Sequence, residues 1–212
     1  MGQPAPSDDP YGSKIVSTCH NDTYPFINPE RGAISDIKVL VTGASKGIGR
    51  ETVKSFARAG ASAIALLARS QLEDAANDAL EAAKAAGHKE PKILKLQADM
   101  SDPAAVERAM DTVAEEFQSL DVVINNASRL EKWVPLAETD IDDWWLTWEV
   151  NLRGTYIVTR AALPLVLKGQ LKTIVTLTSA GAFISAYVLS LPILSQILNY
   201  PSSNEKNDTE GF

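Results

Sequence analysis

The sequence predicts an α/β fold in which helices cover both faces of one parallel sheet, giving three layers. Short apolar, β-branched runs alternate along the chain with longer segments of helical periodicity. Strands that alternate with helices pair in parallel through right-handed crossovers, which gives a doubly wound sheet. The length of 212 residues, at about 150 residues per domain, favours one such domain.

Each element has a local signal. The first strand is a β-branched run that is stopped by Thr42-Gly43, and the helix after it stops at Gly60. Pro103 suits the first position of a later helix. The predicted strands are residues 37–41, 63–67, 93–96, 121–124 and 173–178. The predicted helices are residues 47–59, 72–86, 103–117 and about 141–167.

The two ends of the chain differ from this alternation. Residues 1–35 contain several prolines and no sustained period, so we expect an N-terminal extension. The α/β domain is then residues 36–181, and residues 182–212 form a C-terminal tail. No period of 20–50 residues repeats beyond the strand–helix alternation.

Composition narrows the function classes. With 45% hydrophobic and 22% charged residues the chain is globular, which excludes a collagen-like or largely disordered protein. A formal charge of -7 repels polyanions, so nucleic acid is not expected as a partner. The single cysteine, Cys19, has no intramolecular disulfide partner, and with His20 and His88 it is too little for a zinc site. We therefore expect no metal, and a reducing, cytoplasmic location.

No targeting or membrane segment is expected either. The N-terminus is polar and rich in proline and lacks the basic start and apolar core of a secretion signal. No charge occurs between Lys172 and Glu205, but Pro192 and several polar residues interrupt that stretch. A spanning helix needs about 20 predominantly apolar residues, so we expect no membrane span.

A glycine-rich loop follows the first predicted strand. Glycines in such a loop allow a tight turn and a close approach to a pyrophosphate, and the next helix offers its free N–H groups to the phosphates. The position between a strand and a helix is the context that a dinucleotide site requires. The candidate binding residues are Thr42, Gly43, Ser45, Lys46, Gly47, Ile48 and Gly49.

Two cations favour NADP(H) over NAD(H). Arg69 lies 20 residues after Gly49, at the end of the second predicted strand. An acidic residue near this point would accept the ribose 2′-hydroxyl of NAD, whereas arginine suits a 2′-phosphate. Lys46 supplies a second positive charge. The alternative is that each is a solvated surface cation.

These motifs, with others in the same order, resemble the short-chain dehydrogenase/reductase family and its Rossmann fold. The family's glycine motif is matched by Thr42 to Gly49. Its acidic residue after the third strand is matched by Asp99, followed by Met100. The remaining matches are Asn125-Asn126-Ala127-Ser128, with serine in place of the family's glycine, then Asn151 and Ser179.

The resemblance implies a role for each match. Asp99 and Met100 would contact the adenine end of the cofactor, and Asn126 and Ala127 would line its pocket. Asn151 would hold a water in a proton relay, and Ser179 would be the catalytic serine. It also implies a small carbonyl or alcohol substrate, and a homo-oligomer for intact members.

Structural alternatives stay open for several of these residues. Asp99 could cap the following helix, Asn126 could only tie strands together, and Ser179 could only end a strand. A further cluster, which could be core or subunit contact rather than a substrate cage, comprises Trp144, Trp145 and Trp148.

The chain departs from the family at its catalytic pair. The family's chemistry needs a tyrosine and a lysine four residues later, but none of the five tyrosines has that lysine. The family usually places the tyrosine 13 residues after the serine, where this chain has Pro192, and Lys206 is the one lysine after Ser179. We therefore expect a truncated or aberrant member whose sheet is incomplete at its C-terminal side.

The function expected from the sequence is an NADP(H)-dependent oxidoreductase that interconverts a carbonyl and an alcohol, with impaired activity. The alternative is a catalytically inactive NADP(H)-binding or regulatory remnant of such an enzyme. A third possibility, a doubly wound methyltransferase with a nucleoside cofactor, is disfavoured by Asn125-Asn126-Ala127 and Ser179.

Overall fold

The computed structural model describes residues 24–29, 34–132 and 134–178. They form one five-stranded parallel sheet with the strand order β3-β2-β1-β4-β5. The fold class predicted from the sequence is confirmed. The strands are β1 (Lys38–Thr42), β2 (Ala63–Ala68), β3 (Lys92–Gln97), β4 (Val122–Asn125) and β5 (Thr173–Thr176).

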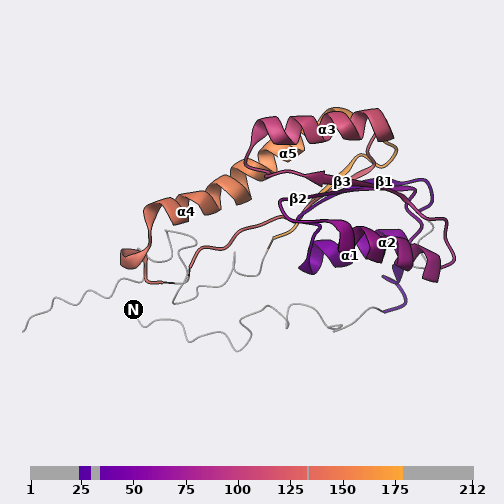
Figure 1. Cartoon of the computed structure of the whole chain (residues 1–212), viewed down its shortest axis with the longest axis horizontal. Helices are drawn as coiled ribbons and strands as arrows, with labels where there is room; N and C mark the ends of the chain where they lie inside the picture. Colours follow the sequence, from indigo (N-terminus) through magenta and orange to yellow (C-terminus); the bar gives the residue numbers. More distant parts are fainter. Residues whose placement is uncertain (1–23, 30–33, 133, 179–212) are drawn as a thin grey trace, which may run out of the picture.

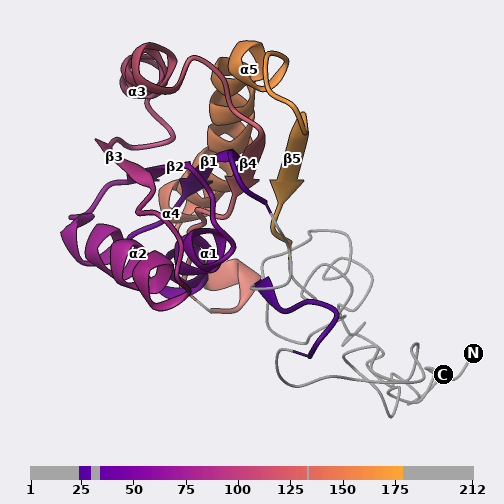
Figure 2. The same cartoon turned by 90° about the vertical axis from the view of Figure 1, so that its right-hand side faces the viewer.

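Helices cover both faces of the sheet. Figure 2 shows α1 and α2 on one side of the strands and α3 and α5 on the other. The helices are α1 (Gly47–Arg58), α2 (Glu73–Ala85), α3 (Pro103–Phe117), α4 (Ile141–Trp148) and α5 (Thr155–Val166), with a short 3₁₀ turn η3 (Leu136–Glu138) and a π-helix η4 (Glu149–Gly154). The predicted tail, residues 182–212, lies outside the described residues, as does most of the N-terminal extension.

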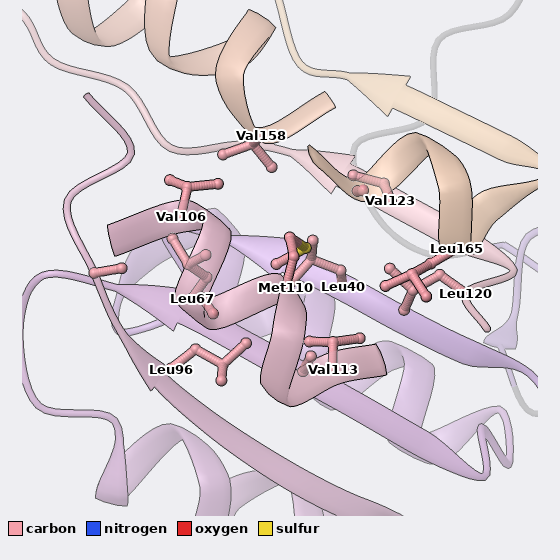
Figure 3. Close-up of a cluster of buried hydrophobic side chains, with 14 of the residues drawn as sticks. Leu40, Leu67, Leu96, Val106, Met110, Val113, Leu120, Val123, Val158 and Leu165 are labelled. Atoms are coloured by element: carbon pink, nitrogen blue, oxygen red, sulfur yellow. The ribbon is translucent and has the colours of Figure 1, made fainter. Parts of the chain in front are cut away.

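Two apolar layers hold the sheet between its helices. One lies under α3 and α5 and includes Leu40, Leu67, Val106, Val123 and Val158, which point toward one another in Figure 3. The other lies under α1 and α2. Every residue of β2 is buried, as expected for a central strand of a parallel sheet covered on both sides.

The sequence placed the elements well, with one difference. The helix predicted over residues 141–167 is present but contains the π-helical turn of η4. Figure 1 shows α4 and α5 following one another as one rod that projects past the sheet. Such turns carry one extra residue per turn and are frequent at functional sites, and the helical periodicity of the sequence does not reveal them. None of the described helices is long and apolar enough to cross a membrane.

The start of α3 confirms the predicted position of Pro103. Asp102 Oδ1 accepts hydrogen bonds from the N–H groups of Ala104 and Ala105, at 2.9 and 3.2 Å, and Pro103 occupies the first helical position. An N-cap carboxylate with proline after it satisfies free N–H groups where the helix begins. The cap is therefore Asp102 and not Asp99, which leaves Asp99 available for another role.

Candidate functional site

The strand order locates a crevice. From β1 the chain crosses to β2 and β3 on one side and to β4 and β5 on the other. In open α/β sheets, ligands bind outside the carboxyl ends of the strands at such a switch point. Thr42 ends β1 and Asn125 ends β4, so the glycine loop and the Asn126–Ala127 segment meet there.

The glycine loop is packed against the end of β4. Gly43 has a φ of +66°, and a Cβ atom there would lie 2.8 Å from Ala127 Cα. A Cβ at Gly49 would lie 2.3 Å from the carbonyl oxygen of Gly43. Gly47, with a φ of +55°, differs because a Cβ there would meet no described atom within 4 Å. Gly43 and Gly49 are therefore required by the fold itself, whereas Gly47 faces open space where a ligand can approach.

Backbone donors at the start of α1 face the same region. Lys46 precedes the helix in an extended conformation, and its side chain does not cap the helix. Gly47 and Ile48 are exposed. The first N–H groups of a helix lack intrahelical acceptors and favour a negative charge. This end of α1 can therefore receive phosphate oxygens.

Thr42 and Asn126 join β1 to the segment after β4. The hydroxyl oxygen of Thr42 accepts hydrogen bonds from the N–H groups of Asn126 and Ala127, both at 3.0 Å. Asn126 Nδ2 donates to the carbonyl oxygens of Thr42, at 2.9 Å, and Gly43, at 3.4 Å. Asn126 therefore ties the strands together, as one alternative from the sequence expected, and shapes the crevice wall by the same contacts.

Arg69 and Asp99 meet at the ends of β2 and β3. Arg69 Nη1 lies 3.5 Å from Asp99 Oδ2, and the Arg69 side chain is 68% exposed. Gln97 Nε2 donates to the Arg69 carbonyl oxygen at 2.8 Å. The guanidinium group is thus held at the crevice edge with most of its donors directed to solvent.

Ionisation of Asp99 follows from its partners. Burial raises the pKa of this carboxyl group. The hydrogen bonds from the N–H and hydroxyl of Ser101 and the charge of Arg69 lower it, and together they outweigh burial, so the pKa lies below its ordinary value. Ser101 donates to Asp99 Oδ1 through both groups, at 2.9 and 2.7 Å. Asp99 is therefore an anion and a hydrogen-bond acceptor at neutral pH.

A pair of hydroxyl groups joins the two loops that carry the predicted cations. Ser70 Oγ donates to Ser45 Oγ at 2.9 Å, across 25 positions of sequence. Lys46 and Arg69 are the chain neighbours of these serines, so this contact brings both cation-bearing loops to one edge. Ser70 was not among the residues predicted from the sequence. A hydroxyl residue directly after the predicted arginine is the signal that could have identified it.

Met100 contributes differently from its neighbour Asp99. Its side chain is buried in the core under α3 and α5. A Cβ at Gly154 would lie 2.9 Å from Met100 Cγ, so this glycine allows η4 to pack against it. Any contact of position 100 with a cofactor would therefore involve its main chain.

Asn151 lies in the π-helix η4 and clamps the loop after β4. Its Oδ1 accepts from the N–H of Arg129, and its Nδ2 donates to the Arg129 carbonyl oxygen, both at 2.8 Å. The Asn151 carbonyl oxygen accepts from Thr155 Oγ1 at 2.8 Å. The predicted water-holding role of Asn151 stays a prediction, while its side chain has a visible structural partner.

The tryptophans of α4 are not a single buried cluster. Trp144 and Trp148 are partly buried with ring centroids 5.7 Å apart, whereas Trp145 is 57% exposed.

Ser179, the predicted catalytic serine, lies outside the described residues. Among the residues that the structure describes, no group of three or more His, Cys, Asp or Glu side chains could hold a metal ion.

Comparison with known proteins agrees with this architecture. The family model for the short chain dehydrogenase matches residues 38–191. The chain is 54% identical over 174 residues to the short chain dehydrogenase mpl6 of Monascus purpureus, which covers 82% of this chain and 60% of that protein. It is 45% identical over 189 residues to the short chain dehydrogenase pigC of Monascus ruber, covering 89% and 62%. The chain thus spans less than two thirds of the length of these relatives.

A solved structure shows the same fold with a cofactor. A short chain dehydrogenase of Shigella flexneri, complexed with NADP, superimposes with a TM-score of 0.64 at 28% identity, covering 72% of this chain and 62% of that one. The family match extends from the first residue of β1 past the end of β5 and so includes the whole crevice described above. This chain belongs to the short chain dehydrogenase family of oxidoreductases.

Proposed function

We propose that this chain binds NADP(H) across the carboxyl ends of its strands and derives from an enzyme that interconverts a carbonyl and an alcohol. The observation that carries the cofactor choice is the edge formed by Ser45, Lys46, Arg69 and Ser70, where two hydroxyls and two cations belong to two joined loops. A 2′-phosphate is a dianion that such an edge would stabilise by charge-assisted hydrogen bonds.

Different parts of the site would contact different parts of the cofactor. The adenosine half would lie against Arg69 and Asp99, and the pyrophosphate against the start of α1 near Gly47. The second half would then meet the Asn126–Ala127 segment beyond the switch point. Bound NADPH would supply a hydride to the carbonyl carbon. In this proposal Ser179 would donate a hydrogen bond to the substrate oxygen.

The test of the cofactor choice is a titration with NADPH and NADH, followed by the Arg69→Asp variant. A charge-assisted contact contributes about 1.5–3 kcal/mol, so wild type should prefer NADPH by roughly 10- to 150-fold. Arg69→Asp should reverse this preference, because a second carboxylate beside Asp99 repels the 2′-phosphate and can accept from a ribose hydroxyl. Arg108→Asp, an equal charge change at an exposed position of α3, should leave the ratio unchanged. Equal binding of both cofactors by wild type would refute the assignment.

Reduction of a carbonyl group by this chain should be slow. Positioned acid–base catalysis contributes about 10²- to 10⁴-fold, and no tyrosine here has a lysine four residues later. We expect NADPH oxidation with a panel of ketones and quinones below about 1 s⁻¹. Faster turnover that is lost in Ser179→Ala or Tyr187→Phe would contradict the expectation. No turnover with retained NADPH binding would favour the alternative, an NADP(H)-binding or regulatory remnant.

We further infer that two copies of the chain associate through the rod formed by α4, η4 and α5. Large apolar side chains are exposed on α4, on η4 and along α5, and we call this set of residues the α4–α5 stripe. Large apolar patches that are exposed on a soluble protein often mark an interaction surface. The stripe consists of Ile141, Trp145, Leu152, Tyr156, Leu163 and Leu167.

A further inference from the structure

We propose that the guanidinium group of Arg129 is a positioning element, which holds the loop after β4 in the conformation that meets the nicotinamide half of the cofactor. The inference rests on the proposed NADP(H) site. It concerns a residue that the glycine, asparagine and serine motifs do not include. Arg129 stands two positions after Ala127, in the segment between β4 and α4.

The Arg129 side chain attaches this segment to α4. Nη1 donates to the carbonyl oxygen of Asp143 at 2.8 Å and to the hydroxyl oxygen of Thr147 at 2.6 Å. Nη2 donates to the carboxylate of Asp143. The Arg129 side chain is 20% exposed and Thr147 is 2% exposed. The Asp143 side chain is 32% exposed, so the bond to Thr147 is largely withdrawn from water and the ion pair with Asp143 only partly. Charge-assisted contacts are stronger where water is excluded.

The main chain of Arg129 is held by Asn151, which lies one turn after Thr147. Asn151 bonds both the N–H and the carbonyl oxygen of Arg129 at 2.8 Å. Asp143, Thr147 and Asn151 follow one another at intervals of four, so they lie along one face of the α4–η4 stretch. Arg129 thus contacts three successive turns, two through its side chain and one through its main chain.

This attachment reaches the crevice by a short path. Asn126 is bonded to the carbonyl oxygens of Thr42 and Gly43, and only two residues separate it from Arg129. The segment from Asn126 to Arg129 is therefore fixed at both ends, to the glycine loop and to α4. Without the guanidinium group, one end would keep only the Asn151 clamp, and the buried Thr147 hydroxyl would lose its donor. The wall beyond the switch point would then loosen, while the Arg69 edge would keep all its contacts.

The test compares two ligands that share the adenosine half. NADPH and adenosine 2′,5′-bisphosphate are titrated calorimetrically into wild type, Arg129→Met, Arg129→Lys and Thr147→Val. In Arg129→Met we expect the NADPH dissociation constant to rise about 10-fold and that of the bisphosphate to change less than about 2-fold. Arg129→Lys should restore part of the NADPH affinity, because an ammonium group reaches fewer of the three acceptors. Thr147→Val should weaken NADPH binding in the same direction by a smaller factor.

The control is Arg50→Met. Arg50 Nε lies 2.8 Å from Asp78 Oδ2 in a pair of similar exposure that joins α1 to α2 on the other face of the sheet. It should leave the ratio of the two dissociation constants at the wild-type value. Parallel loss of both ligands in Arg129→Met, or an unchanged ratio, would overturn the positioning role and leave the cofactor site intact. A wild-type chain that binds neither ligand would overturn the proposed function and this inference together.

Discussion

At the scale of a residue, the ionised side chain of Asp143 helps to hold the loop that follows β4. The hydrogen bond from Arg129 is the main cause that places the pKa of Asp143 below its ordinary value, with the N–H of Lys132 acting in the same direction against burial. Asp143 lies in the first turn of α4, and its main-chain N–H donates to Asp140 Oδ1 at 2.8 Å. Ionisation of Asp143 thus links the start of α4 to the loop after β4.

This link should depend on pH in a defined direction. A carboxyl group whose pKa is lower in the folded than in the unfolded state stabilises the fold above its ordinary pKa. That contribution is lost as the pH falls through the folded pKa, so the window lies below about pH 4. We expect Asp143→Asn to unfold at lower urea concentration than wild type at pH 7 and at pH 5, and the difference to shrink as the pH falls from about 4 to 3. A constant difference across this range would contradict the argument. Asp111→Asn, at an exposed position of α3, is the control.

At the scale of an element, the glycine loop combines two requirements that the spacing alone does not separate. Gly49 is in contact with backbone, since a Cβ there would lie 2.3 Å from the Gly43 carbonyl oxygen. Gly47 meets only the left-handed backbone requirement. Gly49 therefore serves the packing of α1 against β1, and Gly47 serves the approach of a ligand.

Alanine substitutions should separate these two roles. Gly49→Ala should reduce the free energy of unfolding by about 3 kcal/mol or more, because backbone has to move. Gly47→Ala should cost only about 1–2 kcal/mol, the strain of a left-handed residue, but should weaken NADPH binding. Gly87→Ala has the same strain at a φ of +76° with no described atom within 4 Å, and should leave binding unchanged. Urea unfolding and cofactor titration of the three variants check this, and unaltered NADPH binding in Gly47→Ala would refute the second role.

At the scale of the whole molecule, two exposed apolar surfaces are candidates for association in solution. One is the α4–α5 stripe, on which Leu152 and Tyr156 are 63% and 65% exposed. The other is β5, which among the described strands pairs with β4 alone; Val175 on this strand and Leu177 just after it are exposed. Unpaired strand edges in apolar surroundings promote association, as does an uncovered helix stripe.

A pair of charge substitutions distinguishes the two surfaces. If the stripe joins two copies, Leu152→Glu should convert a dimer into a monomer, because a carboxylate in an apolar interface has to be desolvated. Val175→Lys on β5 is the matched variant and should leave the dimer intact while reducing larger aggregates. Light scattering after size exclusion, at several concentrations, gives the masses. A dimer that persists in Leu152→Glu and dissociates in Val175→Lys would place the interface on β5 instead.

The sequence by itself determined the fold class, the order of the elements and the glycine loop, because these depend on local periodicity and on residues close in the chain. The alternation of strands and helices allows essentially one handedness of crossover, and the segment from Gly43 to Gly49 leads from the end of β1 into the first turn of α1. The tertiary structure decided which residues far apart in sequence meet. Ser45 contacts Ser70 because the pairing of β1 with β2 brings the loops after these two strands to one edge. Arg129 contacts Asp143, Thr147 and Asn151 because α4 and η4 pack against the segment that follows β4. The π-helix that contains Asn151 packs against Met100 through Gly154, and the helical periodicity of the sequence does not reveal this turn.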